Sequence, residues 1–202
     1  MLKYLRAFSN IIINYRLYFV PILIYELYFY IYYNKNYNKF KYLDSNFLSD
    51  SIPCPYFFLK KIEDYIQKKN IELICDLGSG YGKILYFFGK ICKKKIHGVE
   101  IEKEIYLESG KLISENIRIF NEDILKFDLN SFNYNAFILN DPLKKESDLY
   151  KLIFRIKNTF ENVDIILINL DIKKQLIVKK ELNIVKKFEA SINKNIFFCK
   201  IK

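Results

Sequence analysis

Residues 71–83 read IELICDLGSGYGK, an apolar run followed by a turn with glycine at alternate positions. We predict a buried strand at residues 71–75 and, after the turn, a helix that runs through Ile91. Glycine at alternate positions lets the backbone pass close beneath a ligand, in conformations that a Cβ would forbid, and leaves backbone amides pointing toward it. The stretch therefore predicts a ligand-binding site at the carboxyl end of the strand.

The spacing of the glycines distinguishes this turn from two other nucleotide-binding loops. A dinucleotide-binding G-x-G-x-x-G that began at Gly78 would need glycine where Lys83 stands, and a P-loop would need serine or threonine where Ile84 stands. The remaining pattern, D-x-G-x-G-x-G from Asp76 to Gly82, resembles motif I of the class I S-adenosylmethionine-dependent methyltransferases. That resemblance implies S-adenosyl-L-methionine as the cofactor, with the carboxylate of Asp76 taking its amino group directly or through water.

Helices and strands alternate from about residue 51 onward, and this alternation predicts the fold class. Strands that repeatedly follow helices form a mainly parallel sheet with helices on both faces. A short turn joins the last two strands and predicts an antiparallel hairpin. We expect an α/β, doubly wound, mainly parallel, seven-stranded Rossmann-like sheet with a C-terminal antiparallel hairpin and an N-terminal apolar helix. The other predicted strands are residues 95–99, 117–120, 136–139, 164–169, 182–190 and 195–201, and the other predicted helices are residues 56–69, 103–113 and 148–157.

Two acids follow the second and third predicted strands, at the same end of the sheet as the glycine turn. Glu100 lies about 20 residues beyond that turn, where a doubly wound site holds the hydroxyls of a ribose. By the methyltransferase resemblance, Asp123 rather than Glu122 accepts a hydrogen bond from the adenine amino group, and Ile124 packs against the ring. The predicted cofactor-binding residues are Asp76, Gly78, Ser79, Gly80, Gly82, Glu100, Asp123 and Ile124.

The fourth predicted strand ends in Asn140-Asp141-Pro142-Leu143, where this fold addresses a methyl acceptor. The segment resembles motif IV of amino-group methyltransferases, Asn/Asp-Pro-Pro-aromatic, whose oxygens hold the target NH2 while the aromatic ring stacks on it. Here Asp141 replaces the first proline and Leu143 the aromatic residue, which disfavours a nucleic-acid base. The extra carboxylate suits a cationic acceptor such as lysine, which must lose a proton before it attacks. An ordinary turn at a strand end is the alternative.

Residues 51–56 read SIPCPY and precede the helix that leads into motif I. They resemble the Thr-Pro-Tyr signature of a group of small single-domain methyltransferases, although Cys54 stands where that signature has threonine. Relatives in that group include membrane-anchored lysine methyltransferases. The resemblance implies that Tyr56 closes over the cofactor or acceptor channel; alternatively, Tyr56 packs the first helix. The predicted catalytic residues are Tyr56, Asn140, Asp141 and Pro142.

Residues 11–33 form an apolar, tyrosine-rich stretch with one acid, Glu26, and basic residues on both sides. Three arrangements stay open: a strained membrane-spanning helix, an interfacial helix on anionic lipid, or a helix that docks on the catalytic domain. We predict an N-terminal helix and linker at residues 1–50 and a methyltransferase domain at residues 51–202. Deletion of residues 1–33 is expected to leave catalysis intact. The expected location is the cytoplasm, or the inner face of a membrane if the stretch contacts lipid.

Composition limits the remaining functions. The chain has 202 residues, 51% of them hydrophobic, which excludes a disordered chain. Four cysteines without paired spacing and the single His97 disfavour a metal site. The net charge of +10 reflects lysines dispersed along the chain, so nucleic acid is an open but unfavoured partner. We expect a methyltransferase of a protein lysine; an RNA base methyltransferase or a non-catalytic cofactor-binding module tethered to the membrane are the alternatives.

Overall fold

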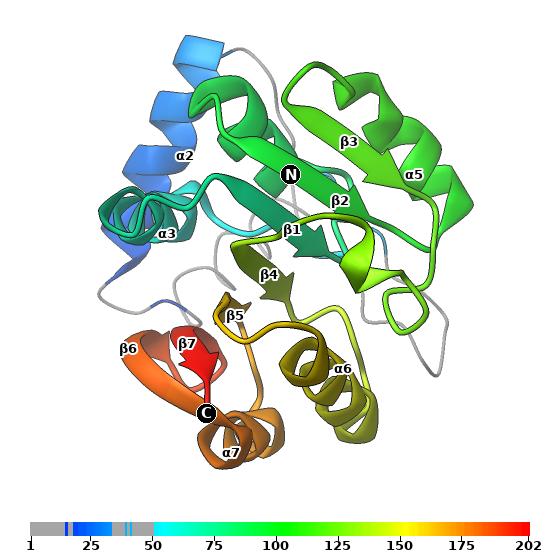
Figure 1. Cartoon of the computed structure of the whole chain (residues 1–202). Coiled ribbons are helices and arrows are strands. Elements are labelled where there is room, and N and C mark those ends of the chain that lie inside the picture. Colours follow the sequence, from blue (N-terminus) through cyan, green and yellow to red (C-terminus); the bar gives the residue numbers. More distant parts are fainter. Residues whose placement is uncertain (1–14, 16–17, 34–38, 40, 42–50) are drawn as a thin grey trace.

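The computed structural model of the protein describes residues 15, 18–33, 39, 41 and 51–202. Its centre is a seven-stranded sheet with the strand order β3-β2-β1-β4-β5-β7-β6 (Figure 1). The first five strands pair in parallel, and β7 runs antiparallel to β5 and to β6. The predicted fold class, including the C-terminal hairpin, is therefore confirmed. The strands are β1 (Leu73–Leu77), β2 (Lys95–Val99), β3 (Ile117–Phe120), β4 (Ala136–Asn140), β5 (Asp164–Ile168), β6 (Leu182–Ser191) and β7 (Lys194–Ile201).

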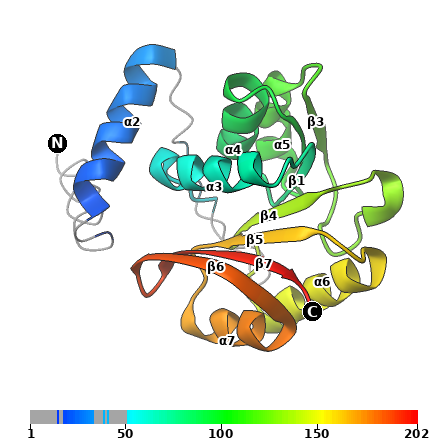
Figure 2. The ribbon, with the colours of Figure 1, turned by 60° about the vertical axis from the view of Figure 1, so that its left-hand side comes forward.

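Helices cover both faces of the sheet (Figure 2). Successive side chains of a strand point to opposite faces, so Ile74 and Ile138 pack under one helix layer while Cys75 and Phe137 pack under the other. The first layer consists of α3 (Tyr56–Lys68), α4 (Lys83–Leu85), the π-helical turn η2 (Tyr86–Ile91) and α5 (Lys103–Ser109); the second consists of α6 (Glu146–Thr159) and α7 (Ile172–Glu181). The glycine turn, between β1 and α4, thus lies at the carboxyl edge of the sheet.

Two differences from the sequence-based expectation concern residues at or near the site. Strand β1 begins two residues later than predicted, because the backbone amide of Ile71 still bonds to the carbonyl of Ile66 at the end of α3. Asp76 consequently lies inside the strand rather than in the turn. Helix α7 was not predicted at all, since two of its buried residues are polar, Lys174 and Gln175, and they interrupt the apolar periodicity.

Helix α2 (Phe19–Tyr33) lies beside α3, which corresponds to the docked arrangement of the N-terminal stretch (Figure 2). Its buried residues are Ile22 and Phe29, and the ring of Phe29 stacks on Tyr56 with the centroids 4.3 Å apart. Among the described residues, none of the helices combines the length and apolar character that crossing a bilayer requires. The part of the predicted N-terminal segment that follows α2, up to residue 50, lies outside the described residues except for positions 39 and 41.

Candidate functional site

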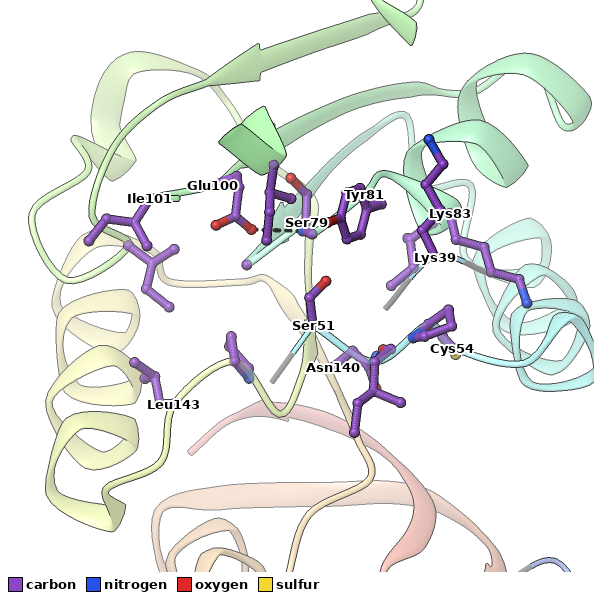
Figure 3. A pocket seen from close by; sticks show the side chains of 18 of the residues that line it. Lys39, Ser51, Cys54, Ser79, Tyr81, Lys83, Glu100, Ile101, Asn140 and Leu143 are labelled. Atoms are coloured by element: carbon purple, nitrogen blue, oxygen red, sulfur yellow. Dashed lines mark hydrogen bonds between the residues drawn. The ribbon is translucent and has the colours of Figure 1, made fainter. Parts of the chain in front are cut away.

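One cavity opens at the carboxyl ends of β1, β2, β3 and β4, and it brings most of the predicted site residues together (Figure 3). Parallel strands end at the same edge of a sheet, which is why residues distant in sequence meet here. Its wall contains Gly78, Ser79, Gly80, Glu100, Asp123, Ile124, Asn140 and Pro142 from the prediction, and Lys39, Ser51, Ile52, Pro53, Cys54, Tyr81, Lys83, Ile84, Ile101, Ile105 and Leu143 in addition. Asp76, Gly82, Asp141 and Tyr56 do not line it.

The glycine turn forms the floor of the cavity with backbone that only glycine adopts easily. Gly78 and Gly80 have φ angles of +87° and +54°. A Cβ on Gly78 would come 2.3 Å from the Cβ of Pro142, and a Cβ on Gly80 would come 2.7 Å from the hydroxyl of Ser51. Gly78 therefore allows the turn after β4 to approach, and Gly80 keeps room between the floor and the segment that precedes α3.

Glu100 connects the glycine turn to the end of β2. Its carboxylate accepts hydrogen bonds from the backbone amides of Gly80 at 2.9 Å and of Glu102 at 2.8 Å. Burial raises the pKa of this carboxyl, and the amide hydrogen bonds oppose that rise. In Figure 3 the side chains of Glu100 and Ser79 lie in the upper half of the view, and those of Asn140 and Leu143 lie in the lower half. A carboxylate held in this way can accept further hydrogen bonds from a hydroxyl-bearing ligand.

Asp76 lies behind the glycine turn and is fully buried. Within the described part of the chain, neither of its carboxylate oxygens has a hydrogen-bond partner, and the hydroxyl of Ser79 lacks one as well. Burial, and secondarily the charge of Glu100, raises the pKa of Asp76 well above the usual carboxyl range. A buried carboxyl without a partner is costly, and a cationic ligand nearby would reduce that cost.

The turn after β3 supplies an acid and an apolar side chain to the wall. Asp123 lines the cavity, and one of its carboxylate oxygens accepts a hydrogen bond from the amide of Leu125 at 2.9 Å. Ile124 is buried beside it. An oxygen acceptor next to an aliphatic surface suits the edge and the face of a purine.

Asn140 lines the cavity at the end of β4, and both the nitrogen and the oxygen of its side-chain amide form hydrogen bonds. Its nitrogen donates to the carbonyl of Ile52 at 2.9 Å, and its oxygen accepts from the side-chain nitrogen of Asn169 at 2.7 Å. Asn169 follows β5 with a φ of +60°, and its own buried oxygen has no hydrogen-bond partner among the described residues. Sequence reasoning missed Asn169, because only the pairing of β4 with β5 places it next to Asn140.

Asp141 does not face the cavity as the lysine hypothesis requires. Its carboxylate accepts a hydrogen bond from the ammonium of Lys174 at 2.6 Å, and Lys174 is buried in α7. Burial raises the pKa of Asp141, while the contact with Lys174 acts in the opposite direction. A carboxylate that already neutralises a lysine of its own chain is poorly suited to receive a second cation.

Tyr56 lies outside the cavity wall, with its ring between Phe29 of α2 and the ammonium of Lys83, which is 4.1 Å from the ring centroid. This placement corresponds to the packing alternative for Tyr56. The residues just before it, from Ser51 to Cys54, do line the cavity, so the segment singled out from the sequence contributes wall residues other than its tyrosine.

The residues in the wall of this cavity and directly behind it fit S-adenosylmethionine on three structural grounds. The glycine floor has no room for side chains at positions 78 and 80. The buried carboxylate of Asp76 lacks a partner in the described residues, as an acid meant for a cationic group would. Two separate carboxylates, Glu100 and Asp123, line the cavity at the ends of β2 and β3 and could accept hydrogen bonds from such a ligand.

Sheet order and cavity position together define the class: the chain has the class I S-adenosylmethionine-dependent methyltransferase fold, as predicted. It is similar to the solved structure of magnesium protoporphyrin IX methyltransferase from Synechocystis PCC 6803 with bound SAM, with a TM-score of 0.60, 14% identity, and coverage of 72% of this chain and 78% of that chain. It is also similar to an RNA methyltransferase from Salinibacter ruber in complex with S-adenosyl-L-homocysteine, with a TM-score of 0.58, 13% identity, and coverage of 74% and 94%. These likenesses concern the fold.

Sequence comparison adds a more specific similarity. A curated relative, the ribosomal RNA small subunit methyltransferase A of Wigglesworthia glossinidia brevipalpis, is 34% identical over 106 residues, which are 52% of this chain and 37% of that protein. The chain thus matches little more than a third of the length of that relative. No protein-family model matches the chain. None of these three proteins is named as a lysine methyltransferase, and the resemblance of residues 51–56 to a Thr-Pro-Tyr signature gains no support from them.

Proposed function

We propose that the chain is an S-adenosylmethionine-dependent methyltransferase and that its acceptor is an amino nitrogen of an RNA base. One observation carries the proposal: the glycine turn, Glu100, Asp123 and Asn140 come from four strand ends and line a single cavity. The residues with proposed roles in methyl transfer lie within residues 51–202.

The proposed cofactor-binding roles follow the sequence-based prediction except for that of Asp76. Glu100 binds the ribose hydroxyls and Asp123 the adenine amino group, with Ile124 against the ring. Gly78 and Gly80 keep the floor free of side chains. Asp76 acts from behind the floor as the negative charge that favours the cationic methionine part, rather than as a direct ligand at the surface of the cavity.

Asn140 is the proposed acceptor-binding residue. The cofactor, when bound, would supply a methyl group activated by its sulfonium; the acceptor nitrogen would form the new N–C bond while the S–C electron pair stays with sulfur, and the methylated nitrogen would then release one proton to solvent. The amide oxygen of Asn140 has one lone pair left after its bond from Asn169, and it accepts a hydrogen bond from the amino group of the acceptor. Pro142 is rigid and packs on Gly78, and it holds this turn against the floor.

Two arguments favour RNA over protein lysine as the acceptor. The relative with the highest identity among those described above is named as a ribosomal RNA methyltransferase. The acid that favoured a lysine acceptor, Asp141, is paired with Lys174. The absence of an aromatic residue at position 143 remains a departure from the amino-group motif; buried Leu143 offers an apolar surface instead.

The test is transfer of label from methyl-labelled S-adenosylmethionine into an extract of the source cells, which is then divided into nuclease-sensitive, protease-sensitive and solvent-extractable fractions. Gly80→Val, in which we expect cofactor binding to be strongly weakened, serves as the control. Label in the nuclease-sensitive fraction, with wild type only, supports the proposal. Label in protein would overturn the acceptor and restore the lysine hypothesis, and no label above the control in any fraction would overturn the catalytic function.

A further inference from the structure

The one acid of α2 points into the protein rather than toward solvent. Both carboxylate oxygens of Glu26 contact the ammonium of Lys83, at 2.9 and 3.0 Å. One of these oxygens also accepts a hydrogen bond from the backbone amide of Tyr56 at 2.7 Å. Glu26 therefore connects α2 to the first residue of α3 and to the first residue of α4.

Lys83 lies where the glycine turn meets helix α4, in the wall of the cofactor cavity. It directly follows Gly82, the last glycine of the turn, and it lines the cavity wall. Its side chain is only 4% exposed, and burial lowers the pKa of its ammonium, whereas Glu26 raises it. A buried ammonium is stable only when a carboxylate or comparable polar groups replace its water.

We propose that Glu26 is a positioning residue of the cofactor site: by holding Lys83 in its buried place, it fixes the first turn of α4 and thereby the glycine floor. This inference rests on the proposed function. If Glu26 is lost, the buried ammonium of Lys83 loses this carboxylate partner, which favours loss of its proton or a shift of its side chain toward the cavity that it lines. Either change disturbs the amides that face the ligand.

Helix α2 is then part of the methyltransferase unit. The aromatic contacts agree with this, because Phe29 of α2 stacks on Tyr56, whose ring in turn lies beneath the ammonium of Lys83. The expectation that residues 1–33 can be removed without effect on catalysis is replaced by the opposite one, since such a deletion removes Glu26 and leaves Lys83 in a wall without that carboxylate.

The experiment measures the affinity of the full chain for S-adenosylhomocysteine by calorimetry. Glu26→Gln keeps an acceptor for the amide of Tyr56 and removes the charge; we expect affinity about tenfold weaker than wild type. In the double variant Glu26→Gln/Lys83→Met, the unbranched methionine fills the space without needing a counter-ion. We expect this double variant to bind more tightly than Glu26→Gln alone, which a merely structural contact would not produce.

Glu181→Gln is the matched control. Glu181 pairs with Lys157 at 3.4 Å, its side chain is 17% exposed against 21% for Glu26, and it lies on α7, away from the cavity. We expect the Glu181→Gln variant to bind S-adenosylhomocysteine with the same affinity as wild type.

Three results would overturn the inference. In the first, Glu26→Gln lowers the melting temperature as Glu181→Gln does but binds the ligand normally. In the second, the double variant binds the ligand no more tightly than Glu26→Gln. If Glu26→Gln does not fold, the inference stands only if the double variant folds and binds the ligand. In the third, wild type itself shows no binding, and the proposed function then fails together with the inference.

Discussion

The ammonium of Lys174 lies 2.6 Å from a carboxylate oxygen of Asp141, and this pair fills the place where the sequence suggested a free acid for a cationic substrate. The same ammonium lies 3.6 Å from a carboxylate oxygen of Asp171, the residue just before α7. The pair joins α7 to the turn after β4, next to Asn140. It thus supports the acceptor side of the cavity from behind.

Breaking this pair is expected to destabilise the protein. Asp141→Asn leaves the buried ammonium of Lys174 with a weaker partner, and we expect the free energy of unfolding to fall by about 2 kcal/mol. Lys174→Met added to Asp141→Asn should recover part of that loss, measured by urea unfolding as a double-mutant cycle. Lys173→Met is the control, because the side chain of Lys173 is 81% exposed. Strictly additive effects at positions 141 and 174 would show that the pair has no energetic coupling.

The glycine floor can be tested at Gly80. Gly80→Val combines a φ of +54° with a Cβ only 2.7 Å from the hydroxyl of Ser51, so we expect the affinity for S-adenosylhomocysteine to fall by at least about tenfold. Gly110→Ala is the control, since a Cβ there meets nothing within 4 Å. Calorimetry on the two variants gives the comparison. Equal affinities in wild type and Gly80→Val would remove the glycine turn from the binding site.

Asp76 should make the stability of the ligand-free protein depend on pH. Because its pKa is raised in the folded state, the folded chain holds this proton more tightly than the unfolded chain. Its contribution to stability is therefore greatest below the usual carboxyl pKa of about 3.9 and is lost as the pH rises through the raised value. Asp76→Asn cannot ionise, so its stability relative to wild type should increase with pH above the usual carboxyl range, measured by urea unfolding at several pH values. A pH-independent difference would mean that Asp76 ionises as easily in the folded chain as in the unfolded one.

Asn169 should affect the acceptor step rather than cofactor binding. Asn169→Leu removes the hydrogen bond to the oxygen of Asn140, which is then oriented only through its nitrogen and the carbonyl of Ile52. We expect kcat for methyl transfer to RNA to fall about tenfold, with the affinity for S-adenosylhomocysteine changed less than about twofold. The exposed Asn162 provides the control variant, Asn162→Leu. A loss of cofactor affinity equal to the loss of rate would place Asn169 in the support of the cofactor site instead.

Local patterns in the sequence account for the framework of the protein. Strands β2 and β3 coincide with the predicted residues 95–99 and 117–120, because branched apolar residues at alternate or near-alternate positions between turn residues can be identified without a distant partner. The glycine turn is equally local, since its spacing reflects the backbone geometry of a few consecutive residues. The cavity-lining positions of Glu100, Asp123 and Asn140 follow from these strands, as parallel strands end at one edge.

The polar interior could not be predicted in the same way. Helix α7 was not predicted because its buried residue Lys174 pairs with Asp141, an acid 33 residues earlier in the chain. Glu26 and Lys83 are 57 residues apart, and their ion pair exists only because α2 packs beside α3. Sequence periodicity reports which faces are apolar, whereas the pairing of buried charges depends on distances set by the packed helices and strands. The sequence by itself therefore determined the sheet, the glycine turn and the acids at the strand ends; only the tertiary structure decided that Asp141 is already neutralised and that α2 supplies a counter-ion at the wall of the cavity.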